Sequence, residues 1–315
     1  MKIKNAFAGV CGTDLHLYFD PMVFGGNLPQ ILGHEFSGSV VEKGQDVTDF
    51  NVGDRATGFP IQYCGECGAC AKRAYFACTR QHMLGLSSSG GGMSEFTVVD
   101  AAKLHKLPDN VDLRMGALVE AMAVAGHAVN RSGVVAVQSA LVAGAGPVGI
   151  GLWFALRARR VERVLVSEPN ESRRKALADL GATVVDPVKG DLAAAAAAAE
   201  LSGGAGLDVA FDAAGVGPAI QSAVMSLAPG GRVVVVALHE QHMEYQPTLL
   251  VMREAEIVGA IGYMPEDFDS VIRAMADGKC DTTGWVEEFE IGDLADVIKA
   301  LHEGRGTKVL TKSSA

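Results

Sequence analysis

The order of apolar and polar residues divides the chain into two regions of different texture. Up to about Ala123 the chain is rich in glycine, valine and turn residues, with short alternating runs such as Phe36–Val41 and Met93–Val99. This pattern predicts an irregular β domain. From Ser139 onward, apolar strands, glycine turns and amphipathic helices alternate, as in βαβ units that build a parallel sheet.

The second region predicts individual elements. Strands are expected at Ala140–Ala143, Val161–Ser167, Thr183–Val185, Leu207–Ala213, Arg232–Ala237 and Glu256–Ile261. Helices are expected at Pro147–Arg159, Glu171–Leu180, Leu192–Leu201 and Pro218–Leu227, with turns at Ser202–Gly206 and Pro229–Gly231. Two more helices, near Asp267–Ala276 and Leu294–Glu303, and a final strand at Thr307–Thr311 complete the prediction.

Composition narrows the class of protein. A length of 315 residues suggests about two domains, and 49% hydrophobic with 20% charged residues is ordinary for a folded chain. A formal charge of −10 disfavours nucleic acid as a partner. No run approaches the ~18 apolar residues of a membrane span, and Met1–Asn5 lacks the apolar core of a secretory signal. We expect a cytoplasmic protein with a small-molecule partner and neither nucleic acid nor membrane.

A glycine-rich turn follows the first predicted strand of the second region. Gly144-Ala145-Gly146-Pro147-Val148-Gly149 then opens a helix, which is the context that makes a GxGxxG pattern a dinucleotide site. Gly144 allows the tight turn, Gly146 admits the pyrophosphate and Gly149 packs the helix on the strand, while Pro147 and Val148 begin the helix whose N-terminus favours phosphate.

An acidic residue stands where such sites bind the ribose. Glu168 lies at the end of the next strand, about 20 residues further on, where a carboxylate can accept both ribose hydroxyls and repel a 2′-phosphate. We therefore expect NAD in preference to NADP. A solvated loop acid is the alternative for Glu168, and Arg173, counted here among the cofactor-binding residues, could with Arg174 still tolerate a phosphate.

Four of the six cysteines are close together in the sequence: Cys64, Cys67, Cys70 and Cys78. Small residues between them let one loop wrap a tetrahedral ion, and four sulfur ligands leave no position for water. This spacing predicts a structural zinc site. An iron–sulfur cluster, which also uses four cysteines, is the alternative.

A second set of possible ligands is dispersed. Cys11, His34 and Glu120 would supply sulfur, nitrogen and oxygen and leave a coordination position open, as a catalytic zinc requires. Taken singly, His34 could be an ordinary buried histidine and Glu120 a helix-surface acid. Their occurrence together with a dinucleotide loop and a four-cysteine loop favours the metal site.

In this order the motifs resemble the zinc-containing medium-chain alcohol dehydrogenases over nearly the whole chain. The resemblance looks strongest to the 2,3-butanediol dehydrogenases of the sorbitol dehydrogenase branch. It rests on Cys11–His16, Gly33–Glu35, Val52–Arg55, the two motifs above, Val119–Val124, Leu104–Val111, Ser167–Pro169 and Gly90–Gly92. It implies a fold of α/β plus β type, with a GroES-like catalytic domain at 1–123 and 271–315 and an inserted Rossmann NAD-binding domain at 124–270. It also implies a homodimer or homotetramer.

The resemblance assigns roles to residues near Cys11. Cys11 and His34 become ligands of a catalytic zinc, and the third ligand is Glu120 or Glu35. Thr13 takes the place of the hydroxyl that bonds the substrate alcohol, and His16 that of the histidine that passes the proton to solvent.

Asp14 would orient the His34 imidazole, although a local turn cap explains it equally well without the resemblance.

The chain departs from the family pattern in two places. Cys11 follows only ten residues, so the usual N-terminal hairpin is missing; a mis-assigned start codon is our preferred explanation, and a bare strand edge is expected otherwise. Ala121 and Gly126 stand where the branch has proline and a larger residue, which could alter the size of substrate accepted.

The expected reaction is reversible hydride transfer between a secondary alcohol or vicinal diol, of the 2,3-butanediol/acetoin type, and NAD. Sorbitol, another polyol or threonine is an alternative substrate, and a catalytically inactive zinc- and nucleotide-binding subunit is an alternative of another class. Cys280 is expected to be a buried structural thiol. His239 and His242 have no assigned role, although they follow a strand whose carboxyl end should face the cofactor.

Overall fold

The structure is a computed structural model that describes residues 1–20, 29–88, 90–189, 198–239, 241–242 and 246–313. It divides into two compact units. Unit 1 comprises Met1–Ala121, Met264–Gly278 and Thr282–Ala315, and unit 2 comprises Met122–Tyr263 and Lys279–Asp281. The sequence placed these divisions near residues 123 and 270. No helix among the described residues is long and apolar enough to cross a membrane.

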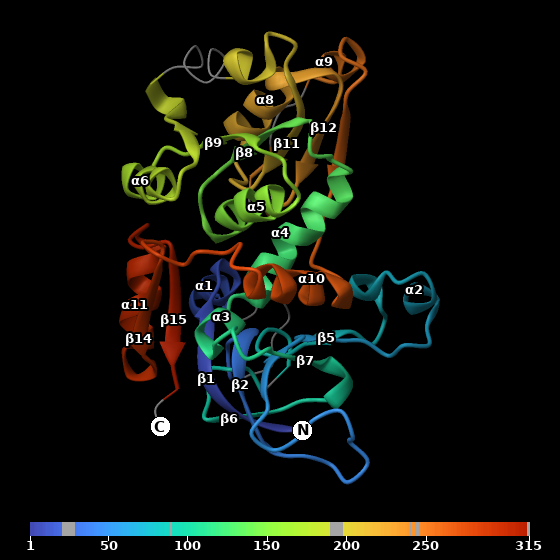
Figure 1. Cartoon of the computed structure of the whole chain (residues 1–315), viewed down its shortest axis with the longest axis vertical. Helices are drawn as coiled ribbons and strands as arrows, with labels where there is room; N and C mark the ends of the chain where they lie inside the picture. Colours follow the sequence, from blue (N-terminus) through green and yellow to red (C-terminus); the bar gives the residue numbers. More distant parts are fainter. Residues whose placement is uncertain (21–28, 89, 190–197, 240, 243–245, 314–315) are drawn as a thin grey trace. The chain divides into compact units, whose positions relative to one another are not determined.

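Unit 1 is built on a seven-stranded sheet in the order β14-β15-β1-β2-β3-β7, with β6 also paired to β1. Its strands are β1 (Lys2–Val10), β2 (Glu35–Glu42), β3 (Arg55–Gly58), β6 (Phe96–Val98), β7 (Leu104–Lys106), β14 (Val286–Glu290) and β15 (Lys308–Lys312). A two-stranded sheet joins β4 (Ile61–Gln62) to β5 (His82–Met83). The first strand of the chain thus pairs antiparallel with the last, as Figure 1 shows.

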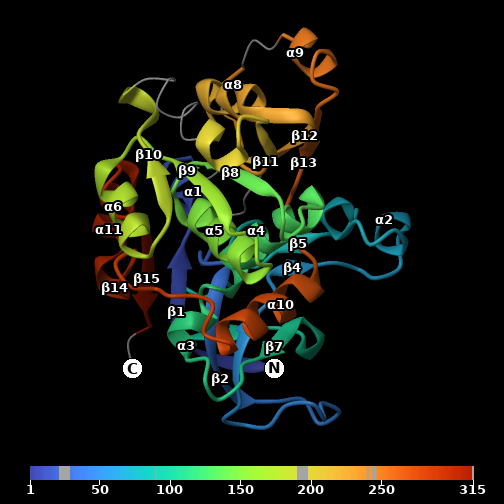
Figure 2. The same ribbon diagram turned by 45° about the horizontal axis from the view of Figure 1, so that its top comes forward.

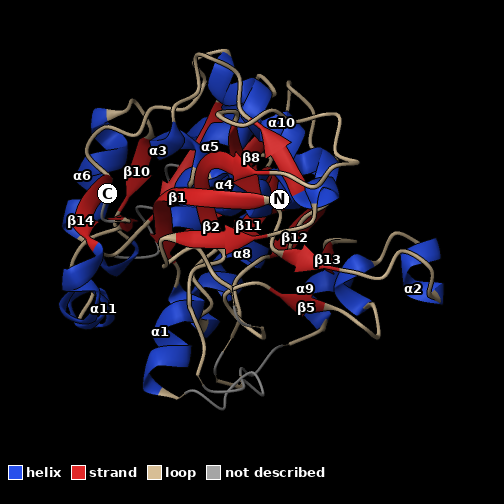
Figure 3. Ribbon diagram, turned by 90° about the horizontal axis from the view of Figure 1, so that it is seen from below, coloured by secondary structure: helices blue, strands red, loops and turns tan. Residues whose placement is uncertain are grey.

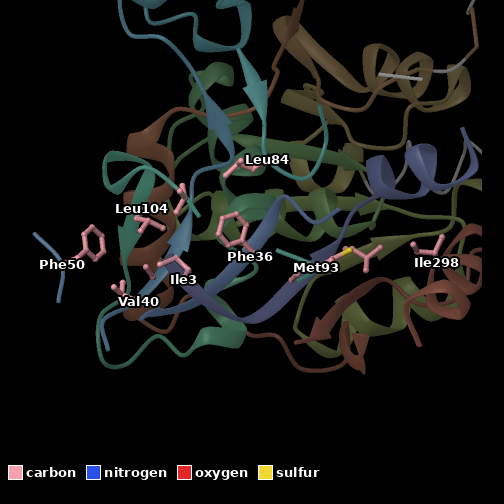
Figure 4. Packing of buried hydrophobic residues seen from close by; sticks show 12 residues of the cluster. Ile3, Phe36, Val40, Phe50, Leu84, Met93, Leu104 and Ile298 are labelled. Carbon is pink, nitrogen blue, oxygen red and sulfur yellow. The ribbon is translucent and has the colours of Figure 1, made fainter. Parts of the chain in front are cut away.

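Figure 4 shows a cluster of buried apolar side chains in unit 1, which includes Ile3 of β1 and Phe36 and Val40 of β2. Ile3 and Phe36 are fully buried. Two glycines leave the space that the Phe36 side chain occupies. A Cβ atom on Gly58 would lie 2.1 Å from the Phe36 ring, and one on Gly92 would lie 2.2 Å from the Phe36 Cβ. Burial of a side chain of this size stabilises the unit by roughly 1.5–3 kcal/mol.

Helices in unit 1 are α1 (Gly12–Phe19), α2 (Gly68–Ala71), α3 (Leu113–Gly116), α10 (Pro265–Ala276) and α11 (Leu294–His302), while α4 (Val119–Ser132) begins in unit 1 and continues into unit 2. Short 3-10 helices occupy Tyr75–Ala77, Ala101–Lys103 and Ile291–Asp293. In Figure 3, which is coloured by secondary structure, β1 and β2 run side by side.

Unit 2 is a parallel sheet of six strands in the order β10-β9-β8-β11-β12-β13 (Figure 2). The strands are β8 (Ser139–Ala143), β9 (Arg163–Ser167), β10 (Thr183–Val185), β11 (Leu207–Asp212), β12 (Leu227–Val235) and β13 (Glu256–Gly259). The helices are α5 (Pro147–Ala158), α6 (Glu171–Asp179), α8 (Gly217–Ser226) and α9 (Thr248–Val251), with a 3-10 turn at Pro187–Lys189. The strand order reverses between β8 and β11, and ligands of such sheets bind outside the carboxyl ends of the strands at that point.

The elements expected from the sequence differ from the structure in a few places. Pro229–Gly231, expected to be a turn before a strand, lies inside β12, where pairing with β11 jumps from Leu207↔Leu227 to Val209↔Arg232. The extra residues form an irregularity that proline and glycine tolerate in a strand. Strands β1 and β14 were not predicted, and most of the helix expected at Leu192–Leu201 lies outside the described residues. A strand edge without a pairing partner was expected near the N-terminus, but β1 is not such an edge, because it pairs with β15, β2 and β6.

Candidate active site

The glycine-rich turn has the backbone geometry expected of a dinucleotide loop. Gly144 follows β8 with a φ of +104°, which a residue with a side chain rarely adopts. A Cβ atom on Gly149 would lie 1.9 Å from the carbonyl oxygen of Gly144, so α5 approaches the turn too closely for any other residue. Gly146 caps α5, has nothing within 4 Å of its Cβ position, and is followed by Pro147 in the first turn. The start of α5, including Val148, is thus open to an anion.

Glu168 is buried at the carboxyl end of β9, with 4% of its surface exposed. Its Oε2 accepts a hydrogen bond from the backbone N–H of Ala145 (2.7 Å), and its Oε1 accepts one from Asn170 (2.8 Å). The alternative of a solvated loop acid is therefore wrong. The carboxylate ties the glycine turn to the loop after β9, and each oxygen retains a lone pair for a further donor.

The two arginines after Glu168 differ in their contacts. Arg174 donates to the carbonyl oxygens of Glu168 and Pro169 and pairs with Asp186 (3.1 Å). Arg173 lies in the first turn of α6, where its backbone N–H donates to the Oδ1 of Asn170. These contacts hold the guanidinium group of Arg174 at the loop that follows Glu168.

The four clustered cysteines bring their sulfur atoms together in unit 1. All four Sγ atoms lie within 4.8 Å of one another, with 3.9 Å from Cys64 to Cys70 and 3.5 Å from Cys64 to Cys78. A tetrahedral zinc with bonds of about 2.3 Å requires sulfur–sulfur distances of about 3.8 Å. An iron–sulfur cluster would hold at least some of its four cysteines further apart, because they would bind different iron atoms. The geometry fits a single zinc ion.

Backbone donors prepare one of these thiols for metal binding. Hydrogen bonds from the backbone of Glu66 and then Cys67 lower the pKa of Cys64 to about 5. Burial instead raises the pKa of Cys70 to about 11. A bound metal would displace the proton of Cys70, because zinc binds the thiolate.

A second group of ligand atoms joins Cys11, His34 and Glu35, again within 4.8 Å of one another. Cys11 stands between β1 and α1, and His34 and Glu35 lie at the start of β2, whose residue Glu35 pairs with Gly9 of β1. This antiparallel pairing places Cys11, at the end of β1, beside His34 and Glu35, at the start of β2. Sulfur, nitrogen and oxygen donors at this distance suit a zinc ion with an open position.

Asp14 of α1 contacts both Cys11 and His34 of this group. It is fully buried; its Oδ2 accepts from the backbone N–H of Cys11 (2.8 Å), and its Oδ1 lies 3.6 Å from the Nδ1 of His34. Burial lowers the pKa of His34, but Asp14 and then Cys11 outweigh that effect and hold the pKa well above its usual value. With Nδ1 turned toward Asp14, the other ring nitrogen of His34 is the one suited to a metal.

Sequence reasoning missed two residues of this site, Lys308 and Gly9. Lys308, on β15, is 1% exposed and donates both to the carboxylate of Glu35 and to the carbonyl oxygen of Val10 (2.9 Å). Burial lowers the pKa of Lys308, but the charge of Glu35 outweighs it, so the pKa is raised.

Gly9 provides space for this pair, since a Cβ atom there would lie 2.0 Å from the Oε2 of Glu35. A lysine at an inward position of the last strand was the only signal available in the sequence.

The other residues predicted for this site are Glu120, Thr13 and His16, and they differ in how they contact the group of Cys11, His34 and Glu35. Glu120 is 5% exposed in the first turn of α4 and acts electrostatically on Lys308, but it is not a member of the three-residue ligand group. The Sγ of Cys11 lies 3.7 Å from the Oγ1 of Thr13. His16 is on the same helix, three residues after Thr13, and is exposed to solvent.

Comparison with known proteins shows the family to which the chain belongs. Residues 1–109 match the alcohol dehydrogenase GroES-like domain, and residues 147–277 match the zinc-binding dehydrogenase domain. The 2-dehydro-3-deoxy-L-galactonate 5-dehydrogenase of Pseudoalteromonas atlantica is 37% identical, covering 100% of this chain and 92% of that protein.

Two solved structures extend the likeness to the fold. The 2R,3R-butanediol dehydrogenase of Bacillus subtilis has a TM-score of 0.89 at 35% identity, covering 99% of this chain and 92% of that one. A zinc-binding dehydrogenase of Sinorhizobium meliloti bound to NADP has a TM-score of 0.91 at 27% identity, with the same coverage of each chain. With both domain types matched and relatives aligned along its length, the chain belongs to the zinc-containing medium-chain alcohol dehydrogenase family, as an oxidoreductase with a GroES-like and a Rossmann part.

Proposed function

We propose that the protein is an NAD-dependent dehydrogenase that oxidises a secondary alcohol flanked by a second hydroxyl group, and reduces the corresponding ketone. The observation that carries this proposal is the grouping of Cys11, His34 and Glu35 within 4.8 Å. Such a ligand set suits a catalytic metal rather than a closed structural one, because three ligands leave a position for substrate.

Cys11 and His34 would hold the catalytic zinc in this proposal, with Glu35 or Glu120 as third ligand. A zinc ion bound there would lower the pKa of an alcohol hydroxyl, as it lowers that of water to about 7. Lys308 competes for Glu35, since its ammonium group already pairs with that carboxylate. Release of Glu35 toward the metal would therefore require Glu120, also close to Lys308, to compensate the lysine charge.

Thr13 and His16 would move the proton outward. The hydroxyl of Thr13 lies beside the sulfur of Cys11, where it can accept a hydrogen bond from the substrate hydroxyl. His16 is one helical turn further along α1 and faces solvent, so it can carry the proton away from the buried group.

The cofactor is proposed to be NAD. The buried carboxylate of Glu168 beside the glycine turn supports this choice, because a 2′-phosphate there would meet a negative charge. Arg173 is proposed to contact the cofactor at the start of α6.

The substrate is proposed to be a vicinal diol of the 2,3-butanediol type. One relative is named for butanediol and another, of similar identity, for a sugar acid, and both compounds carry neighbouring oxygen functions. A second hydroxyl could reach the metal or a neighbouring carboxylate such as Glu120. We also propose a homodimer or homotetramer in the cytoplasm, as expected from the sequence.

The test is the absorbance of NADH formed from NAD and each of four alcohols: 2,3-butanediol, sorbitol, threonine and an aldonate. Zinc content should be about two per chain. The Cys11→Ser variant should lose activity and about one zinc per chain. The Cys280→Ser variant should keep its activity and its full zinc content, because Cys280 is remote in sequence from both groups of cysteines. NADP in place of NAD should give lower kcat/KM. A chain with two zincs and no turnover on any alcohol would instead support the inactive nucleotide-binding subunit.

A further inference from the structure

A buried aspartate and a histidine meet at the carboxyl edge of the unit 2 sheet, outside every role described so far. Asp212 is the last residue of β11 and is fully buried, and its Oδ2 lies 2.6 Å from the Nε2 of His239, four residues beyond the end of β12. The side chain of His239 retains 18% exposure. The pair is therefore anchored at one end and open to solvent at the other.

Backbone donors from the loops after β11 and β12 fix the aspartate. Its Oδ1 accepts hydrogen bonds from the backbone N–H groups of Ala214 and Gly215 (3.1 Å each), and its carbonyl oxygen accepts from Val236 and Ala237 (3.0 Å each). A carboxylate with these donors is an acceptor only. His239 therefore donates Nε2–H to it, and in the neutral imidazole Nδ1 carries a lone pair that can accept from a ligand.

The pair lies next to the glycine turn. A Cβ atom on Gly144 would lie 3.1 Å from the backbone of Ala213, so the turn after β8 packs on the loop after β11. A Cβ atom on Gly215 would lie 2.8 Å from the carbonyl oxygen of Leu238, so that loop packs in turn on the one after β12. Glu168, the glycine turn, Asp212 and His239 thus follow one another along β9, β8, β11 and β12 at a single edge.

This order fixes where the two halves of a dinucleotide can lie. If the adenosine ribose is at Glu168 and the pyrophosphate is at the start of α5, the remaining half extends over β11 and β12. The loops there also carry two exposed apolar side chains, Val216 (52%) and Leu238 (73%), which suit contact with a flat ring. This half of a nicotinamide dinucleotide offers a carboxamide N–H and ribose hydroxyls as donors.

We propose that His239, oriented by Asp212, binds the nicotinamide half of the dinucleotide by accepting a hydrogen bond at Nδ1. His239 is then a cofactor-binding residue and Asp212 a positioning residue. The inference rests on the proposed NAD-dependent function, and it adds a specificity for the reacting half of the cofactor that Glu168 and the glycine turn do not provide.

Calorimetric titration of the full chain with NADH and with ADP tests the proposal. ADP contains the adenosine and pyrophosphate but neither the nicotinamide nor its ribose. His239→Gln keeps a donor for Asp212 near the position of Nε2 but lacks the Nδ1 acceptor. It should raise the Kd for NADH about 2- to 12-fold, the effect of one hydrogen bond, and leave the Kd for ADP unchanged. Asp212→Asn should act in the same direction, because an amide N–H facing Nε2 converts Nδ1 into a donor.

His242→Gln is the matched control, since His242 is exposed three residues away and should leave both Kd values unchanged. Equal losses for NADH and ADP in His239→Gln would overturn the proposal, because a merely structural pair would affect both ligands. Unchanged NADH binding in that variant would overturn it as well.

If the wild-type chain bound ADP but not NADH, the proposed function itself would fail, and the inference with it. The dinucleotide with acetylpyridine in place of nicotinamide separates the two donors: if the carboxamide N–H is the donor, His239→Gln should cost this analogue nothing, and if a ribose hydroxyl is the donor, it should cost the analogue as much as NADH.

Discussion

Replacing Lys308 with methionine should destabilise unit 1 by about 3–5 kcal/mol, the cost of removing one partner from a buried ion pair. Lys308 and Glu35 each have 1% of their side-chain surface exposed, so water cannot solvate the carboxylate that is left. The carbonyl oxygen of Val10 also loses the donor that it has at 2.9 Å. Methionine has a similar length to lysine, so the loss comes from charge and hydrogen bonding rather than from a cavity.

Urea unfolding followed by tryptophan fluorescence measures this loss. The chain has two tryptophans, and Trp285, next to Lys308 through a backbone hydrogen bond of 3.1 Å, lies in unit 1. In a Trp153→Phe background the signal therefore reports unit 1 alone. With a slope of about 2 kcal/mol/M, the midpoint should fall by about 1.5–2.5 M. The zinc content of each variant should be measured alongside.

A double variant separates the ion pair from other effects. Glu35→Gln combined with Lys308→Met replaces both charges, and such replacements are often neutral. The double variant should therefore be more stable than Lys308→Met alone. A loss below about 1 kcal/mol for the single change, or a double variant whose loss equals the sum of the two single changes, would refute the reasoning.

Four further outcomes are expected. Cys67→Ser should lower the melting temperature and the zinc content to about one per chain while each folded molecule retains its turnover; a stable but inactive variant would contradict the structural assignment. Glu168→Gln should lower the ratio of kcat/KM for NAD to that for NADP, and an unchanged ratio would remove Glu168 from cofactor selection. His16→Ala should slow turnover most at low pH, where solvent bases are scarce, and a loss independent of pH would argue against a proton relay. Burial raises the pKa of Cys280 to about 12, so this thiol should be alkylated at pH 8 about a thousandfold more slowly than a free cysteine, as mass spectrometry can follow.

Much of unit 2 could be predicted because its signals are local. The apolar run before Gly144 and Pro147 at the start of a helix fixed both β8 and α5 to within a residue or so. Pro229–Gly231 misled for a physical reason: the same residues serve in a turn or in an irregular strand, and only the pairing with β11 decides between them.

The candidate metal-binding group was only partly predictable. Short motifs pointed to Cys11 and His34, but the proximity of the Glu35 carboxylate to Cys11 depends on the register of β1 against β2, which brings Glu35 opposite Gly9. Lys308 reaches the same carboxylate from 273 residues further along the chain. No local pattern encodes a partner at such a distance. Strand β14, with three glutamates, also lacked the apolar character by which strands are recognised.

The pairing of β1 with β15 affects the order in which the two units can fold during synthesis. Residues of β15 are synthesised long after those of β1, so β1 lacks this neighbour, and Glu35 lacks Lys308, while the 273 residues from Glu35 to Lys308 are made. Unit 2 is almost continuous in sequence and can fold in the meantime. A nascent chain should therefore form unit 2 first, and the proposed metal site at Cys11 should be complete only once β15 has been synthesised and paired with β1.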